Sequence, residues 1–180
     1  MTLYERVSSE IIPSLQKELK LDNVHQVPRI EKIIVAMGVG SLATRKGVKD
    51  FAELQEHMER MTGQKAHMVL SRKSVSNFKL REGMPSMLKT TLRGKKAYDF
   101  FERLNMLVLP RVRDYTGISP RKFDKSANLN IGLKQYDLFP EIGPDDMKTP
   151  MGLQITIVTS GDDKESVQAF LEKSGMIFQK

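Results

Sequence analysis

The sequence predicts an α+β fold, with a single domain over residues 1–180, a mainly antiparallel sheet with helices packed on one face, and a long mobile basic loop. Helical and strand periodicities interleave along the chain, as expected where helices cover a sheet. The connections at residues 111–128 and 137–150 contain no crossover helix, which favours antiparallel pairing. No repeat or linker divides the 180 residues, so one domain is the economical interpretation.

Four elements are expected in the first part of the chain. Apolar residues four apart between Leu3 and Leu19 indicate an amphipathic helix, which Pro13 would kink or break. A run of branched apolar residues indicates a strand. Apolar residues three and four apart indicate a second helix, which ends before Gly63 because glycine suits a helix C-terminus. In chain order the predicted elements are a helix over 2–20, a strand over 33–37, a helix over 48–61 and a strand over 66–70.

Residues 71–85 form the basic loop of the prediction. They show neither helical nor strand periodicity, and they contain four basic residues together with Gly83 and Pro85. Because the segment is polar and highly charged, we expect it to be disordered until it meets a partner. The rest of the chain predicts a strand over 87–92, a helix over 97–108 stopped by Pro110, a strand over 129–134, a strand over 153–158 and a helix over 162–174.

The positive charge of the chain is concentrated in its middle. The whole sequence carries a formal net charge of +7, and the segment from Lys65 to Lys125 holds 15 basic and 5 acidic residues. A focused positive field attracts polyanions and releases counterions on binding phosphates. Nucleic acid is therefore the leading partner class, with an ordinary solvated basic surface as the alternative. An acidic membrane is a less favoured partner, because the sequence predicts no basic amphipathic helix with bulky apolar anchors.

No catalytic, metal or cofactor site is expected. The chain has no cysteine, so a disulfide framework and a cysteine-ligated metal are excluded. His25, His57 and His67 lack metal-binding spacing, and the acidic pairs at 145–146 and 162–163 suit turns and helix caps. Nucleotide-loop and nucleophile-elbow motifs are incomplete or absent. Without a secretory h-region or an apolar span of about 20 residues, a cytoplasmic protein is expected.

Phe78 is the aromatic side chain whose role the pattern leaves open. It lies among Arg72, Lys73, Lys79 and Arg81 in the basic loop, where a place in the core is hard to assign. It can stack on a nucleic-acid base or pin its own loop, and the sequence supports both interpretations equally.

Seven stretches in order along the chain resemble one family. They are PRIEKI leading to MGVG at 28–40, TGQK at 62–65, FKLREGMP at 78–85, LRG at 92–94, LPRVRD at 109–114, FPEI at 139–142 and ITIVT at 155–159. Together they resemble the bacterial large-subunit ribosomal protein L5 family over nearly the whole chain. The resemblance implies an α+β fold and a structural, non-enzymatic role in translation: binding of 5S rRNA into the central protuberance of the large subunit.

The resemblance also implies further partners and specific site residues. The partners are 23S rRNA, the peptidyl-site tRNA, a small-subunit head protein at an intersubunit bridge, and other central-protuberance proteins. Carried over by position, the 5S rRNA surface comprises Met37, Gly38, Val39, Gly40, Gln64 and Thr91, with phosphate contacts from Lys65, Lys89 and Arg93. The tRNA-facing residues of the basic loop are Arg72, Lys73, Ser74, Phe78, Lys79 and Arg81.

The chain departs from the family pattern at one position and in one turn. The family has an RNA-contacting asparagine where this chain has Ala36, whose side chain neither donates nor accepts a hydrogen bond, so other groups or water have to replace that contact. Between Phe123 and Asn128 the glycine-containing turn of the family is replaced by Asp-Lys-Ser-Ala.

Two rival functions remain at this point. An RNA-modifying or processing enzyme would use the same basic face to hold its substrate, but it would need a general base or metal set near that face. A protein–protein adaptor would use the acidic flanks. Neither explains the seven ordered stretches.

Overall fold

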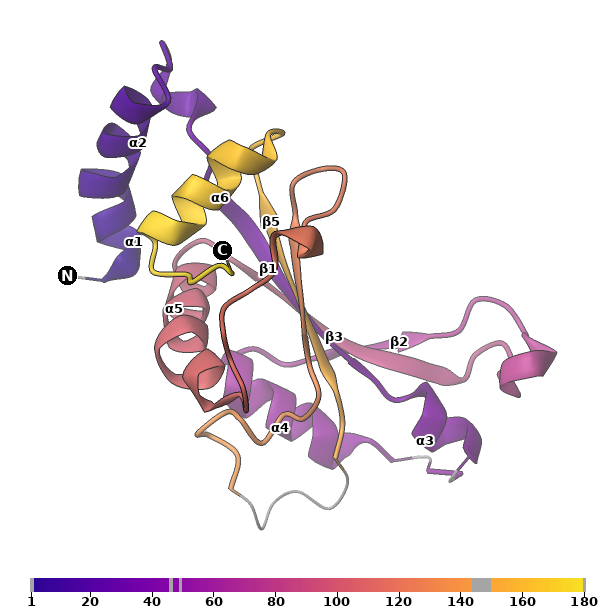
Figure 1. Ribbon diagram of the computed structural model, residues 1–180. Helices are drawn as coiled ribbons and strands as arrows, with labels where there is room; N and C mark the ends of the chain where they lie inside the picture. Colours follow the sequence, from indigo (N-terminus) through magenta and orange to yellow (C-terminus); the bar gives the residue numbers. More distant parts are fainter. Residues whose placement is uncertain (1, 46, 49, 144–149, 180) are drawn as a thin grey trace. The chain divides into compact units, whose positions relative to one another are not determined.

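The computed structural model describes residues 2–45, 47–48, 50–143 and 150–179 (Figure 1). Five strands form an antiparallel sheet in the order β2-β3-β1-β5-β4, and helices accompany it, which confirms the predicted α+β class. Residues 144–149 of the 137–150 connection, which include the acidic pair at 145–146, lie outside the described residues.

The elements follow the predicted order except for α3, a short helix that was not predicted, and the helix predicted over 48–61 begins at Ala52. The elements are α1 (Leu3–Arg6), α2 (Ile12–Glu18), β1 (Ile30–Gly38), α3 (Gly40–Arg45), α4 (Ala52–Thr62), β2 (His67–Leu70), β3 (Pro85–Arg93), α5 (Lys95–Arg103), β4 (Leu129–Leu133), β5 (Leu153–Thr159) and α6 (Lys164–Lys173). π-helical turns at Val7–Ile11 and Leu104–Val108 extend α1 into α2 and continue α5. Short 3-10 turns occupy Val24–Gln26, Ser76–Phe78, Leu109–Arg111 and Pro120–Lys122.

The described residues group into two compact units. The first unit comprises the described residues within 1–33, 92–131 and 156–180, and the second comprises those within 34–91 and 132–155. The unit boundaries fall within β1, β5 and β4 and near the end of β3. The single-domain organisation stays a prediction, and each unit is described by itself below.

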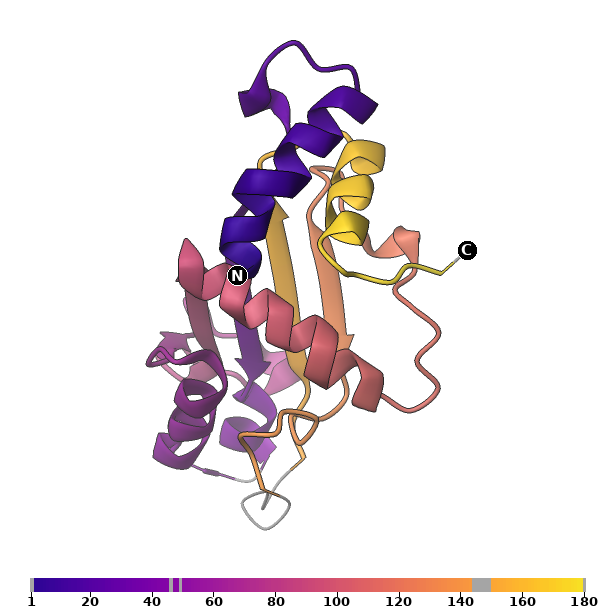
Figure 2. The same ribbon diagram turned by 90° about the vertical axis from the view of Figure 1, so that its left-hand side faces the viewer.

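In the first unit, helices α1, α2, α5 and α6 lie on one side of the strands, as Figure 2 shows. Leu3, Val7, Ile11 and Leu15 are all buried, so the apolar stripe predicted for this helix faces the core. Pro13 does not end the helix. The Ile12 N–H instead donates to the Val7 carbonyl across a π turn just before the proline, which then lies in the first turn of α2, where its missing N–H is tolerated.

Two boundaries in the first unit differ from the prediction. The helix expected over 97–108 starts at Lys95 and continues through a π turn, and Pro110 lies within the 3-10 turn that follows rather than beyond the helical segment. The final helix begins one residue after Asp163, whose carboxylate accepts the Ser166 N–H at 3.0 Å. That cap confirms the interpretation of the acidic pair at 162–163.

In the second unit, the β2–β3 hairpin and the end of α4 carry or adjoin several of the predicted RNA-binding residues. His67 pairs with Lys89 and Met68 with Leu88, with an irregularity at the Val69–Leu70 step. Met58 and Met61 on α4 are fully buried, as expected of an apolar helix face. Gly63 ends α4 in the left-handed conformation, at φ 67°, and its N–H donates to the Glu59 carbonyl at 2.7 Å.

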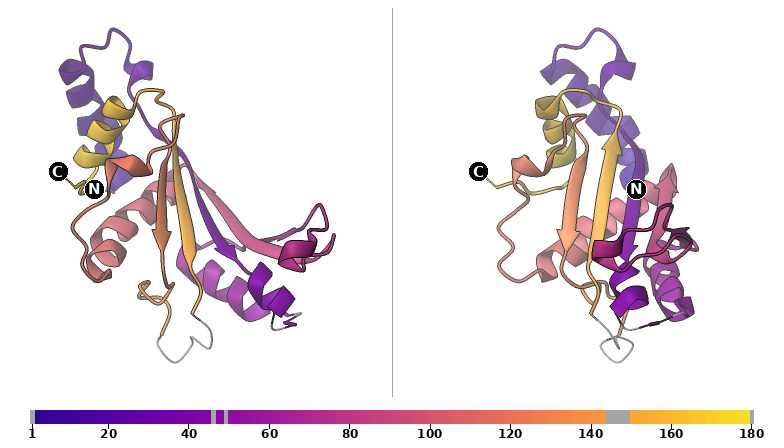
Figure 3. Two further views of the ribbon diagram at one scale, coloured as in Figure 1. Left: turned by 45° about the vertical axis from the view of Figure 1, so that its right-hand side comes forward. Right: turned by 90° about the vertical axis from the view of Figure 1, so that its right-hand side faces the viewer.

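The basic loop is more regular than its sequence predicts. The Ser71 N–H donates to the Met84 carbonyl at 2.8 Å, and Val75 and Leu80 exchange backbone hydrogen bonds of 2.8 and 3.1 Å. These bonds continue the β2–β3 hairpin as a ladder beyond its strands, and Figure 3 shows the loop at the end of that hairpin. Strand β3 begins at Pro85, two residues earlier than predicted. The mobility of the loop stays a prediction.

Candidate nucleic-acid interface

Alternating burial gives the second unit an accessible sheet face. Along β1, buried Val35 and Met37 alternate with partly exposed Ala36 and exposed Gly38. Because side chains alternate across a strand, the more exposed set shares one face.

Strand β3 presents the same alternation to that face. Leu88 and Thr90 are buried, whereas Lys89 and Thr91 between and after them are partly exposed. His67 lies directly across from Lys89 on β2 and is itself exposed, so it joins this face. The strand pairing, which the sequence pattern does not give, is what adds His67 to the site residues.

Gln64 and Thr91, both predicted from the family pattern, are joined in the structure. The Gln64 side-chain amide donates to the Thr91 carbonyl at 3.3 Å across 27 residues of sequence. This bond uses one amide hydrogen of Gln64 and no side-chain group of Thr91. The carboxamide oxygen, the second amide hydrogen and the Thr91 hydroxyl are the groups with which these residues can bind a ligand.

The end of α4 fixes the position of Gln64. The Thr62 hydroxyl lies 2.7 Å from the Met58 carbonyl and 2.9 Å from the Gln64 carbonyl, and it accepts the Gln64 N–H at 3.3 Å. Gly63 supplies the left-handed residue that turns the chain between them. The exposed Lys65 follows immediately. The Thr-Gly-Gln-Lys stretch therefore ends a helix and presents two polar side chains.

The Met37–Gly40 turn contributes backbone rather than side chains. Met37 and Val39 are fully buried in the core, and the Val39 N–H donates to the Ser86 carbonyl at 3.0 Å. Gly38 is exposed and Gly40 partly so. Of the four residues predicted here, the two glycines offer surface to a ligand, the two apolar side chains are buried, and the Val39 backbone bonds the turn to β3.

The six predicted loop residues are all exposed. Ser74 has a second role, because its hydroxyl accepts the Glu82 N–H at 3.0 Å and so ties the two sides of the loop. Phe78 is 75% exposed, which argues against its pinning the loop by burial. Arg93, predicted for the other surface, is also exposed but belongs to the first unit.

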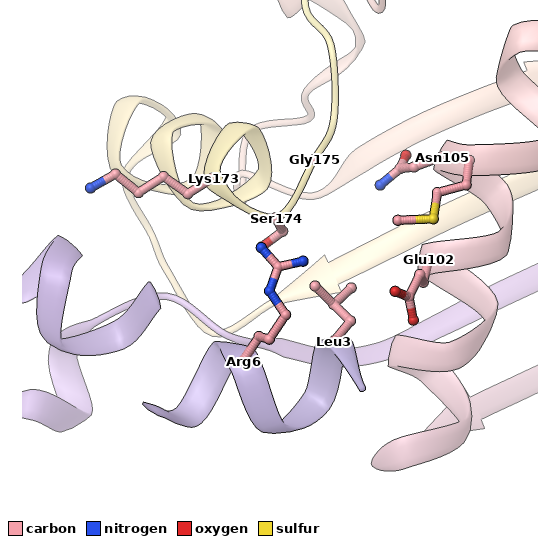
Figure 4. Close-up of a pocket in the computed structure, with 8 residues that line it drawn as sticks. Leu3, Arg6, Glu102, Asn105, Lys173, Ser174 and Gly175 are labelled. Carbon is pink, nitrogen blue, oxygen red and sulfur yellow. The ribbon is translucent and has the colours of Figure 1, made fainter. Parts of the chain in front are cut away.

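A cavity of about 110 Å³ in the first unit holds none of the predicted site residues. Arg6, Glu102 and Lys173 are among its lining residues, so its charges are mixed. The Lys173 ammonium bonds the Ser14 hydroxyl at 2.8 Å and also pairs with Glu18. Figure 4 shows the Lys173 side chain directed away from Arg6 and Glu102. This cavity therefore lacks the uniform positive charge of a polyanion site.

Two features of the described part of the chain bear on other functions. Within residues 2–45, 47–48, 50–143 and 150–179, no three His, Asp or Glu residues gather in a way that could hold a metal ion. Over the same residues, no helix combines the length and the hydropathy that spanning a membrane requires.

Comparison with known proteins decides the family. The family model of the C-terminus of ribosomal protein L5 matches residues 85–178, and the model named Ribosomal protein L5 matches residues 23–81. The chain belongs to the ribosomal protein L5 family. Large ribosomal subunit protein uL5 of Thermotoga maritima is 40% identical over 181 residues, which cover 99% of this chain and 96% of that protein. The uL5 proteins of Brachyspira hyodysenteriae and Prochlorococcus marinus are 44% and 43% identical, over 98% and 100% of this chain and 94% and 99% of their own lengths.

Membership in the L5 family confirms the resemblance in the sequence. The protein is a structural constituent of the large ribosomal subunit, with the ribosome and its rRNA as partners, and it is located with the ribosome in the cytoplasm. It is not an enzyme, so the RNA-modifying alternative is set aside.

Proposed function

We propose that this L5 family protein holds 5S rRNA in the central protuberance through the accessible sheet face of its second unit. The observation that carries the proposal is the Gln64–Thr91 hydrogen bond of 3.3 Å. It brings two polar side chains from separate elements to one place, beside the paired His67 and Lys89.

The chemistry of this face suits helical RNA. A-form RNA offers proteins mainly its phosphates, its 2′-hydroxyls and a wide, shallow minor groove. A sheet face can lie against such a groove, where an amide and a hydroxyl bond 2′-hydroxyls and base edges. Lys65 and Lys89 supply the charge that neutralises phosphates and releases counterions. At Gly38 and Gly40 the lack of side chains allows the RNA backbone to come close to the turn.

Ala36 is the position where this chain departs from the family on that face. It lies on the same side of β1 as Gly38 and is partly exposed, so an asparagine there would point toward the same ligand. We infer that the neighbouring polar groups compensate for it, and that Ala36→Asn strengthens 5S rRNA binding.

The basic loop contacts the peptidyl-site tRNA in this proposal. Its exposed Arg72, Lys73, Lys79 and Arg81 form a phosphate-binding edge on the hairpin that extends from β2 and β3. Contacts with 23S rRNA, with a small-subunit head protein at an intersubunit bridge and with other central-protuberance proteins complete the proposed role.

Binding of the purified protein to 5S rRNA across a salt series, with an unrelated structured RNA as competitor, tests the 5S assignment. We expect preference for 5S rRNA and a steep salt slope. Gln64→Ala and Thr91→Val are expected to weaken 5S binding by about 2- to 10-fold each, as for loss of one hydrogen bond of about 0.5–1.5 kcal/mol. Gln135→Ala, an exposed glutamine outside this face, is the matched control.

Two outcomes would contradict the proposal. Equal binding of 5S rRNA and competitor would remove the basis for a 5S-specific surface. Equal effects of Gln64→Ala and Gln135→Ala would place the 5S rRNA elsewhere on the protein.

A further inference from the structure

Helix α3 and the basic loop line one open pocket of about 410 Å³ in the second unit. Ser41, Thr44 and Arg45 come from α3, and Asn77, Phe78 and Lys79 come from the loop. Both segments can be followed in Figure 1. The volume lies within the roughly 300–1,000 Å³ usual for small-ligand pockets. Gly40, the first residue of α3, is the one α3 residue that the family pattern assigns to RNA, and no ligand is assigned to Ser41, Thr44 or Arg45.

Backbone hydrogen bonds connect the two walls of this pocket. The Val39 N–H, just before α3, donates to the carbonyl of Ser86 at 3.0 Å, and Ser86 itself lines the pocket at the base of the loop. In the loop, the reciprocal Val75–Leu80 hydrogen bonds and the left-handed Lys79, at φ 53°, set the chain around Phe78. The pocket is therefore bounded by hydrogen-bonded backbone on both sides.

The lining of the pocket matches the parts of a nucleotide. Phe78 is 75% exposed, a large apolar surface left in water, and an aromatic face is what an unpaired base stacks on. The Ser41 hydroxyl and the Asn77 amide can bond base edges. The Thr44 hydroxyl donates to the Gly40 carbonyl at 2.9 Å, so its oxygen serves as an acceptor.

The charge of the pocket favours an anionic group. Its lining contains Arg45 and Lys79 and no acidic residue. The cavity of Figure 4, in contrast, has Glu102 beside Arg6 in its lining. A planar guanidinium and an ammonium at one aromatic site suit the phosphate of a nucleotide whose base lies on the ring.

We propose that α3 and the basic loop together form a binding site for one unpaired RNA nucleotide, with its base on Phe78 and its phosphate at Arg45 and Lys79. The inference rests on the proposed role of the loop as an RNA contact and adds two statements to it. The loop recognises an unstacked base as well as RNA backbone, and α3 is part of the same site.

Full-length protein and two RNA probes of equal length test this site. One probe is a hairpin with a seven-nucleotide unpaired loop that carries 4-thiouridine, and the other is a fully paired duplex. We expect wild-type protein to prefer the hairpin, and Phe78→Ala to lower hairpin affinity about 10-fold, within the range that loss of one stacked base causes. Duplex affinity should stay within about twofold, because phosphate contacts do not need the ring.

Matched variants separate stacking from charge and from folding. Phe78→Tyr keeps an aromatic face and should retain hairpin affinity, whereas Phe78→Leu should not. Val75→Ala removes another exposed apolar side chain of the same loop, 38% exposed and outside the pocket lining, and should have no effect. Arg45→Gln should weaken hairpin binding more than Lys17→Gln, which removes the same charge on α2.

Photo-crosslinking of the thiouridine should reach peptides from both α3 and the loop. Equal affinity of wild-type protein for hairpin and duplex, equal loss of both on Phe78→Ala, or crosslinks to the loop alone would each overturn the two-walled nucleotide site. Binding of 5S rRNA, measured on the same variants, reports separately on the proposed function. If wild-type protein binds 5S rRNA no better than competitor RNA but still binds the hairpin in a way that depends on Phe78, the 5S assignment is contradicted and the nucleotide site stays in place.

Discussion

At the scale of single residues, the Asp124 carboxylate builds the turn between Phe123 and Asn128. Its Oδ1 accepts the Ser126 and Asn128 N–H groups at 2.9 and 2.8 Å, and its Oδ2 accepts the Asn128 side-chain amide at 3.0 Å. Ala127 takes a left-handed conformation, at φ 54°, and is fully buried. The carboxylate thus holds a backbone shape that an alanine adopts only at a cost.

Replacement of Asp124 by alanine should destabilise the protein by about 1–2 kcal/mol, since several backbone and side-chain donors lose their acceptor. Asp124→Asn keeps one acceptor oxygen and should lose less. Urea denaturation of the two variants measures the difference, with the exposed Asp22→Ala as control. Equal midpoints for Asp124→Ala and the control would show that the turn does not depend on the carboxylate.

The same carboxylate predicts a pH dependence. The hydrogen bond from the Asn128 side chain, with the two backbone N–H groups, holds the pKa of Asp124 below its ordinary value of 3.8. Because the pKa is lower in the folded state, the stabilisation is fully present above pH 3.8 and is lost as pH falls through the folded pKa. Stability of wild type and Asp124→Ala, measured from about pH 6 to about pH 2.5, should therefore converge at the acid end. A constant difference would contradict this.

At the scale of elements, the predicted helices and strands follow from periodicity, and the misses have physical causes. The π turn before Pro13 leaves Val7 and Ile11 both buried, and a spacing of four residues also fits an α-helix, so the spacing alone does not identify the turn. Helix α3 has six residues and starts at Gly40, too short for a period to show. The ladder in the basic loop consists of backbone bonds between residues such as Val75 and Leu80, which side-chain patterns do not encode.

The candidate site divides in the same way between predictable and unpredictable parts. The resemblance to the L5 family places Gln64 and Thr91 on one surface, whereas no local pattern joins residues 27 positions apart. His67 and the α3 wall of the pocket depend on strand register and on the Val39–Ser86 contact, which exist only in the folded chain.

Gly63 links an element to the function. An alanine at φ 67° places Cβ in a left-handed residue at the end of α4, which costs about 1–2 kcal/mol of stability. If α4 instead unwinds at its end, the Thr62 bonds that hold Gln64 change with it. We expect Gly63→Ala to lower both the thermal midpoint and 5S rRNA affinity. Gly38→Ala, at a position where Cβ would meet no atom within 4 Å, should leave the thermal midpoint nearly unchanged.

At the scale of the whole molecule, the basic middle of the sequence supplies two surfaces with different proposed partners. Lys65 and Lys89 belong to the accessible sheet face, and Lys73, Lys79 and Arg81 belong to the basic loop. Charge alone does not distinguish 5S rRNA from tRNA, since both attract the same field. The groups beside each set, polar Gln64 and Thr91 on the sheet face and aromatic Phe78 with α3 at the loop, are what make the two surfaces chemically different.

Charge reversal in the loop should therefore separate the two proposed functions. Lys73→Glu, Lys79→Glu and Arg81→Glu together replace three phosphate-binding charges with repulsive ones, so tRNA bound in the peptidyl site of ribosomes carrying this variant should dissociate faster. Specific binding of 5S rRNA should keep its preference over competitor RNA, because Gln64, Thr91, Lys65 and Lys89 are unchanged. Unaltered tRNA dissociation would remove the loop from the tRNA contact. Lost 5S preference would show instead that the loop and the sheet face act on one RNA.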